Sequence, residues 1–253
     1  MSATVKQYTF GDLTFRVETP LPMREDALFE AFSSDVGNTP DYCLYVKPFR
    51  DDQIPDGTWP VIIEREKRDL TVYMKTELLP EITVANLFIS ARVANLLPEE
   101  NAFLLHASYV LHEGKAILFS APSGTGKSTQ ARFWESERGS TVVNEDRALI
   151  FKRGDTFMAG GSWATGSAGV TENATAPIRA IVLLGQGPEN RVTPCRPSQA
   201  LARIMPQCTY DETDGQSVDR MFSLLCDLIS QAPILSYDCI NHPSAVEELE
   251  KYL

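Results

Sequence analysis

The residues best suited to chemistry form a short run near the middle of the chain. Residues 121–129 read Ala-Pro-Ser-Gly-Thr-Gly-Lys-Ser-Thr, which matches the phosphate-binding P-loop (Walker A) pattern except that alanine replaces the first glycine. Gly124 and Gly126 let successive backbone N–H groups turn inward around an anion. Lys127 would reach the β- and γ-phosphates of a nucleotide, and the Ser128 hydroxyl would bind Mg²⁺. The expected nucleotide-binding residues are Ser123, Gly124, Thr125, Gly126, Lys127, Ser128 and Thr129.

Two acidic residues lie 18 and 19 positions after Lys127. The β-prone stretch Thr141–Val143 is followed by Asn144, and then by Glu145 and Asp146. An acid at the carboxyl end of a parallel strand beside the P-loop strand can hold Mg²⁺ through water or accept the proton of a substrate hydroxyl. Two adjacent acids allow both roles.

His106 is the third candidate, at the centre of the apolar segment Leu104-Leu105-His106-Ala107-Ser108. A lone histidine in such a segment is usually a buried structural residue. Its position alone therefore assigns it no role.

A buried sheet and a helix are needed to position these candidates. Apolar runs separated by glycine turns predict strands, and apolar residues at helical spacing predict helices. The expected strands are Phe103–Leu111, Lys115–Ser120, Thr141–Val143, Ala148–Phe151 and Ile178–Leu184, and the expected helices are Lys127–Arg138, Val218–Ile229 and Ala245–Leu253.

The first hundred residues predict a separate, strand-rich region. Its alternating stretches are typical of antiparallel strands, and Ile82–Leu97 has the spacing of a helix. We therefore expect an α/β fold with two domains. Residues 1–100 form a strand-rich region ending in a helix, and residues 101–253 form a P-loop nucleotide-binding, kinase-like domain. The alternating stretches are Tyr8–Val17, Tyr42–Pro48, Val61–Glu64 and Leu70–Lys75.

Composition limits the partners and the compartment. With 34 Asp and Glu against 23 Lys and Arg, the formal net charge is −11, which argues against nucleic acid and anionic membrane as partners. No apolar stretch approaches the roughly 18–20 residues of a membrane span, and no signal peptide pattern opens the chain. The five cysteines are scattered without a CxxC pair, which favours the reducing cytoplasm and no metal site made of protein ligands alone.

Six segments follow one another along the chain: LLHAS, the turn Glu113-Gly114-Lys115, APSGTGKST, VVNEDRALI, GGSWATG and APIRAIVLLGQGPENRV. Taken in this order, they resemble the HPr kinase/phosphorylase-like proteins, whose ATP core is related to phosphoenolpyruvate carboxykinase. The resemblance covers about residues 100–253, and its late segments look like the small HPr-kinase-like serine kinase branch often found beside peptide-modifying genes. It implies a P-loop core of the HPr-kinase/carboxykinase type, ATP or GTP with Mg²⁺ as cofactors, and a homo-oligomer, commonly a ring.

The resemblance also implies a role for each candidate residue. His106 matches an active-site histidine, Lys127 the phosphate lysine and Ser128 the Mg²⁺ hydroxyl. Asp146 matches the acid that accepts the proton of the hydroxyl being phosphorylated. Glu145 replaces the first acid of the pair, with the same charge on a longer arm, and would bind the metal.

The chain departs from the family pattern in its glycine-rich loop. Residues 160–169 contain no acid, whereas HPr kinases carry a Mg²⁺-binding glutamate there; Glu172 is the nearest candidate. The kinase-like branch usually reads PWSGE where this chain has residues 162–167, up to Ser167. Trp163 in this loop is either a lid over the nucleotide or substrate, or an aromatic anchor for the loop.

The leading hypothesis is ATP-dependent phosphoryl transfer to a hydroxyl, namely a serine of a peptide, a small protein or a free amino acid. Ala121, Glu145 and the missing acid favour a different hypothesis, a non-catalytic nucleotide-binding scaffold or regulator in peptide modification. A third hypothesis is a carboxykinase-type enzyme acting on a carboxylate metabolite. The sequence shows no set of Mn²⁺ ligands with His and Lys, which counts against this hypothesis.

Overall fold

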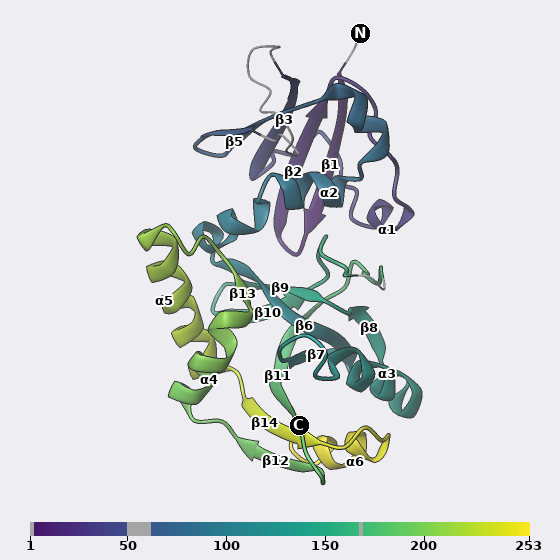
Figure 1. Cartoon of the computed structure of the whole chain (residues 1–253), viewed down its shortest axis with the longest axis vertical. Coiled ribbons are helices and arrows are strands. Elements are labelled where there is room, and N and C mark those ends of the chain that lie inside the picture. The colour runs from purple at the N-terminus through teal and green to yellow at the C-terminus, as the bar shows by residue number, and fades with distance from the viewer. Residues whose placement is uncertain (1–2, 50–61, 167–168) are drawn as a thin grey trace. The chain divides into compact units, whose positions relative to one another are not determined.

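The computed structural model describes residues 3–49, 62–166 and 169–253 (Figure 1). The contacts within the chain divide it into two units, Met1–Val93 and Ala94–Leu253. Val61, at the start of one expected strand, and Ser167, in the glycine-rich loop, lie outside the described residues.

The first unit contains a five-stranded sheet with the order β1-β2-β3-β5-β4. β1 and β2 pair antiparallel, as do β4 and β5, but β3 runs parallel to both β2 and β5. The expectation of an antiparallel region is therefore wrong, because alternation shows which face of a strand is buried and not which way its neighbour runs. The strands are β1 (Thr4–Phe10), β2 (Leu13–Thr19), β3 (Tyr42–Pro48), β4 (Ile62–Glu66) and β5 (Asp69–Met74).

The helix predicted over Ile82–Leu97 is divided into two shorter elements. Its first part ends at Ser90, and Arg92 has a φ of 51°, which a right-handed helix cannot include. A 3₁₀-helix then leads into the second unit. The helical elements of this part of the chain are α1 (Ala27–Glu30), η1 (Thr76–Glu81), α2 (Val84–Ser90) and η2 (Val93–Glu100).

The second unit has a nine-stranded sheet, which confirms the predicted α/β class. Its strands follow the order β10-β9-β6-β7-β11-β14-β12, and β8 and β13 both pair with β6. β7, β11 and β14 are parallel, whereas β6 is antiparallel to β7. The strands are β6 (Ala102–His112), β7 (Lys115–Ser120), β8 (Thr141–Asn144), β9 (Arg147–Arg153), β10 (Thr156–Gly160), β11 (Thr175–Gln186), β12 (Arg191–Pro194), β13 (Cys208–Thr209) and β14 (Ile234–Cys239).

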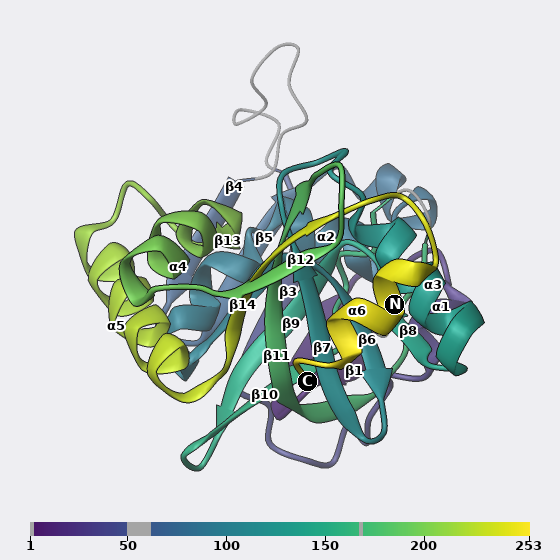
Figure 2. The ribbon, with the colours of Figure 1, turned by 90° about the horizontal axis from the view of Figure 1, so that it is seen from below.

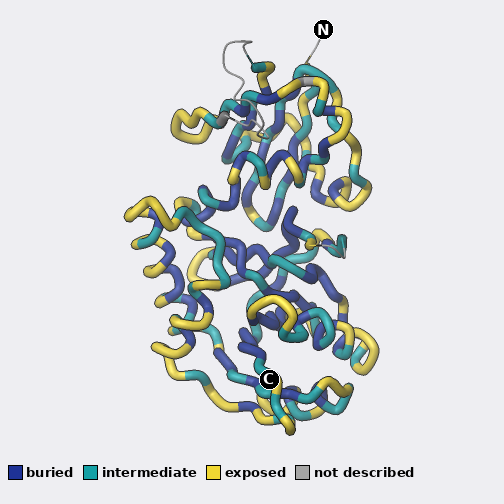
Figure 3. The backbone as a smooth tube through the Cα atoms, in the orientation of Figure 1, coloured by how far each residue is buried: buried dark blue, intermediate teal, exposed yellow. Residues whose placement is uncertain are grey.

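Helices cover both faces of this second sheet (Figure 2). Two of them pack on one face and two on the other, so the central strands lie between two apolar layers. Every residue of β7 after Lys115 is buried (Figure 3). No described helix has the length and apolar character that a membrane span requires. α4 (Pro197–Ile204) and α5 (Gly215–Gln231) lie on one face, α3 (Lys127–Arg138) and α6 (Ser244–Glu250) on the other, and η3 (Met205–Gln207) follows α4.

β6 exchanges its partners along its length. Residues 102–106 pair with β9, and β13 pairs within the same half at residues 104–105. Residues 107–112 pair with β7, and β8 pairs within that half. β8 therefore runs in the direction of β7 but is separated from it by β6. The acidic strand predicted to be the parallel neighbour of β7 is thus wrongly placed, since β11 takes that position and His106 lies on the strand in between.

We expect Phe119→Ala to reveal the contribution of this core. Phe119 is fully buried in β7, in the cluster that includes Trp134 and Val182. Its truncation would leave a cavity and lower the free energy of unfolding by about 3–5 kcal/mol. Chemical denaturation followed by circular dichroism measures this change. Phe222→Ala on α5 is the matched control, because Phe222 is 48% exposed; equal losses in the two variants would contradict the assignment of β7 to the core.

Candidate active site

The P-loop connects β7 to α3, and α3 begins at Lys127 and ends at Arg138 as the sequence predicted. Gly126 precedes the helix with a φ of 112°, and Gly124 has a φ of 79°, values that other residues rarely adopt. No side chain among the described residues caps the helix start. Its first backbone N–H groups are therefore available to an anion at the loop.

Lys127 folds back over its own loop. Its Nζ donates hydrogen bonds to the carbonyl oxygens of Ala121 and Pro122, at 2.9 and 3.3 Å. The residue is only 7% exposed, and this burial lowers the pKa of Lys127, while the charge of Asp146 partly offsets the effect. The ammonium group thus lies against the loop, within electrostatic range of the acid.

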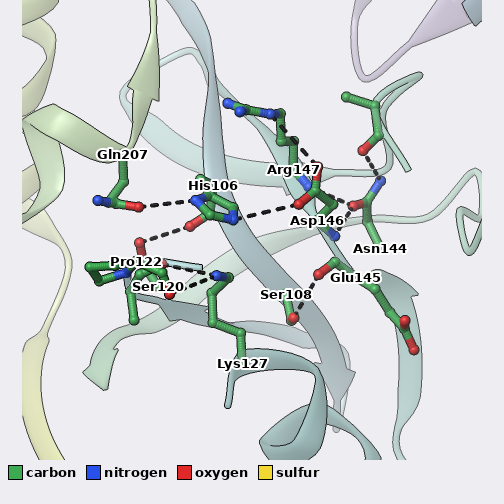
Figure 4. A network of polar contacts seen from close by, with 12 residues as sticks. His106, Ser108, Ser120, Pro122, Lys127, Asn144, Glu145, Asp146, Arg147 and Gln207 are labelled. Carbon is green, nitrogen blue, oxygen red and sulfur yellow. Dashed lines mark hydrogen bonds and ion pairs between the residues drawn. The ribbon is translucent and has the colours of Figure 1, made fainter. Parts of the chain in front are cut away.

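His106 and Asp146 face each other near this loop (Figure 4). Nε2 of His106 is 3.5 Å from Oδ1 of Asp146, and Nδ1 is 3.0 Å from Oε1 of Gln207. Burial lowers the pKa of His106, and the charge of Lys127 lowers it further. These two effects favour the neutral form of the imidazole.

Asn144 builds the turn that directs Asp146 toward His106. Its Oδ1 accepts hydrogen bonds from the backbone N–H groups of Asp146 and Arg147, both at 2.9 Å. The carbonyl of Asp146 in turn accepts from the N–H of Ala107 at 2.9 Å. Asn144 is completely buried. Sequence reasoning missed this residue, although an asparagine directly after the predicted strand Thr141–Val143 is a common turn former.

Glu145 points away from Asp146 and His106 (Figure 4). Its carboxylate pairs with Arg132 of α3 at 2.9 Å, and its carbonyl accepts from the Ser108 hydroxyl at 2.9 Å. Within the ranges that the structure describes, no three His, Cys, Asp or Glu side chains gather closely enough to hold a metal ion. The two adjacent acids therefore have separate surroundings.

A cavity of about 500 Å³ opens beside the P-loop. It lies at the carboxyl ends of β7, β11 and β14, the edge of a parallel sheet where ligands usually bind. Side chains with amide groups contribute to its lining, among them Gln130, Gln186 and Asn241. The cavity therefore offers both hydrogen-bond donors and hydrogen-bond acceptors next to the phosphate loop.

The family described as SynChlorMet cassette protein ScmC matches residues 80–224, more than half of the 253 residues. The chain belongs to this family. No curated protein matches the sequence. A solved structure, the Hpr(Ser) kinase/phosphatase from Coxiella burnetii, is similar with a TM-score of 0.32 and 14% identity, over 59% of this chain and 94% of that chain.

The region matched by the ScmC family includes the P-loop, His106, Asp146 and Gln207, whereas Asn241 of the cavity lies beyond it. Lys127, His106 and Asp146 come together, whereas the side chain of Glu145 is turned toward Arg132. Ser128 lies in the first turn of α3, beside the lysine. Gln207, which the sequence did not indicate, contacts His106 across 101 positions of chain.

The glycine-rich loop of this ScmC-family chain lies against Asp146. Gly166 has a φ of 62°, and a Cβ atom there would be 2.9 Å from the Cβ of Asp146. Trp163 is 1% exposed, so it anchors the loop and is not a lid. Glu172 is exposed, and its backbone N–H donates to the carbonyl of Val143 at 2.9 Å.

We expect Gly166→Ala to displace Asp146. Alanine at a positive φ costs roughly 1 kcal/mol, and the new methyl group would also push against the aspartate. Gly154→Ala is the matched control, since Gly154 has a φ of 60° and no atom within 4 Å of the added carbon. Urea denaturation should show a larger loss for Gly166→Ala, and the amide resonances of Ala107 and Asp146 should shift only in that variant. Equal effects in both variants would contradict the close approach.

Proposed function

We propose that this chain is an HPr-kinase-like phosphotransferase that moves the γ-phosphoryl group of ATP or GTP to a hydroxyl. The acceptor is a serine of a peptide, a small protein or a free amino acid. The observation that carries the proposal is the convergence of Lys127, His106 and Asp146 at one end of the P-loop. A P-loop alone supports nucleotide binding, whereas an acid held against a neutral histidine adds a group that can take a proton.

The P-loop and the adjoining cavity bind different parts of the nucleotide. The N–H groups at the start of α3 and the ammonium group of Lys127 bind the phosphates. Two of the three Nζ donors now meet carbonyl oxygens of the loop, and the phosphates compete for them. The cavity beside the loop then takes the nucleoside, with amide side chains that suit the edges of a base.

In the transfer step, the hydroxyl oxygen of the acceptor forms a bond to the γ-phosphorus. The bond from that phosphorus to the bridging oxygen breaks, the nucleoside diphosphate leaves, and the hydroxyl proton goes to the carboxylate of Asp146. Asn144 and the N–H of Ala107 hold the backbone of Asp146 in place for this role. Positioning and electrostatics supply most of the catalysis in such reactions.

Ser128, which follows Lys127 in the first turn of α3, would bind Mg²⁺ through its hydroxyl. The ion would neutralise phosphate charge, and a single hydroxyl with phosphate oxygens and water suits Mg²⁺ better than a cage of protein ligands. Glu145 fits this role less well than the sequence suggested, because its carboxylate is 7% exposed and paired with Arg132. Its part in metal binding requires that ion pair to open.

The ion pair between Glu145 and Arg132 favours one other function, a nucleotide-binding scaffold without transfer activity. If Glu145 stays paired with Arg132 and the glycine-rich loop supplies no acid, the metal has few protein ligands. Nucleotide binding would then be retained and transfer lost. The two functions differ in the fate of the γ-phosphate.

We expect Lys127→Ala to weaken nucleotide binding by about 10- to 100-fold, because charge-assisted hydrogen bonds to the phosphates are lost. Isothermal titration calorimetry with MgATP and MgGTP measures the affinity. Lys115→Ala removes an exposed lysine from the start of β7 and should bind like wild type. Unchanged affinity in Lys127→Ala would show that the loop does not bind nucleotide.

We expect Asp146→Asn to keep nucleotide affinity and to reduce transfer by about 10²- to 10⁴-fold, the range of general base catalysis. Transfer is followed with γ-labelled ATP and cell extract as the source of acceptors, with Lys127→Ala as the blank and the exposed Asp155→Asn as the matched control. If Asp146→Asn transfers phosphate at the same rate as the wild type, Asp146 is not the base. Tight nucleotide binding with no labelled product from wild type would favour the scaffold.

A further inference from the structure

Gln207 reaches the proposed site from a distant part of the chain. It ends η3, and the two residues after it, Cys208 and Thr209, pair with Leu105 and Leu104 of β6. This pairing places the Gln207 amide next to His106, with its Oε1 3.0 Å from Nδ1 (Figure 4). The contact is therefore fixed by a strand ladder and does not depend on a free loop.

The distances indicate which imidazole nitrogen carries the proton. A neutral histidine has one N–H group and one acceptor nitrogen. An N–H shared with a carboxylate is usually about 2.7–2.9 Å from the oxygen, whereas Nε2 is 3.5 Å from Oδ1 of Asp146. The 3.0 Å contact between Nδ1 and Gln207 lies in the normal range for N–H···O. The proton is thus best placed on Nδ1, which leaves the Nε2 lone pair facing Asp146.

We propose that Gln207 is a positioning residue that fixes His106 with its proton on Nδ1, so that Nε2 is the proton acceptor opposite Asp146. The catalytic consequence rests on the proposed function. When the acceptor hydroxyl gives its proton to Asp146, the new O–H bond faces the Nε2 lone pair. That bond breaks as an N–H bond forms on Nε2, and Asp146 becomes a carboxylate again.

The charged and polar groups around His106 have opposing effects on a proton added to its ring, so the imidazole can accept that proton and release it again. Lys127 and Arg147 oppose a charged imidazole, whereas Asp146 and the Gln207 oxygen favour it. These four groups come from α3, the start of β9, the turn after β8, and η3. The imidazolium formed after transfer would donate from both nitrogens, to Gln207 and to Asp146, without any side chain having to rotate.

The tautomer is read directly from long-range ¹H–¹⁵N correlations of histidine-labelled protein. The chain has three histidines, and the signals of His106 are identified by their loss in His106→Gln. We expect the proton on Nδ1 in wild type and in Gln207→Glu, and its displacement toward Nε2 in Gln207→Leu. A proton on Nε2 in wild type, or the same tautomer in Gln207→Leu as in wild type, would overturn the proposal.

Catalysis gives a second readout. Gln207→Leu should reduce kcat by about 10- to 100-fold, as loss of an orienting partner does, with unchanged nucleotide affinity. The carboxylate of Gln207→Glu should raise the pKa of His106 and the leucine should lower it, so the acidic limb of the rate profile moves in opposite directions. Gln216→Leu changes an exposed glutamine and should match wild type.

The two proposals fail in different ways. Normal transfer and an unshifted pH profile in Gln207→Leu would overturn the positioning role while leaving phosphoryl transfer intact. Absence of transfer in wild type would overturn the proposed function, and the tautomer measurement would still decide whether Gln207 sets the proton on His106.

Discussion

The site depends on the exchange of partners that β6 makes between His106 and Ala107. The half of β6 before that point pairs with β9 and β13, and the half after it pairs with β7 and β8. A strand that changes both neighbours at one place brings the ends of several elements together there. The P-loop follows β7, Asp146 lies between β8 and β9, and Gln207 precedes β13. Hydrogen bonds from Ser120 to the carbonyl of His106 and from Ala107 to that of Asp146 tie these ends together.

Local sequence pattern predicted the part of the site that is local in the chain. The strand Lys115–Ser120, the P-loop and the helix Lys127–Arg138 were placed with their observed bounds, because glycines and an apolar run mark their limits. Long-range pairing was less accessible. Periodicity did not predict β14 or α4, and it placed the acidic strand beside β7. Gln207 lies 101 positions from its partner, and no local pattern relates two such residues.

The acidic pair shows why adjacency in sequence does not mean a shared role. Both acids lie in the bend between β8 and β9, and only one of them faces His106. Asp146 does so, and Glu145 pairs with Arg132, which connects the end of β8 to α3. The pair has one exposed and one buried partner, since 60% of the Arg132 side chain is accessible but only 7% of that of Glu145. It therefore orients the acid and also supplies the charge partner that a buried carboxylate needs.

The charges around His106 give the nucleotide a further effect if the proposed reaction holds. Lys127 and Arg147 lower the pKa of His106, and burial lowers it most. The phosphates of a bound nucleotide would bring negative charge beside Lys127 and reduce its influence on the imidazole. The pKa of His106 would then rise while the acceptor hydroxyl gives up its proton. A histidine that is a poor proton acceptor without nucleotide and a better one with it links proton transfer to occupation of the P-loop.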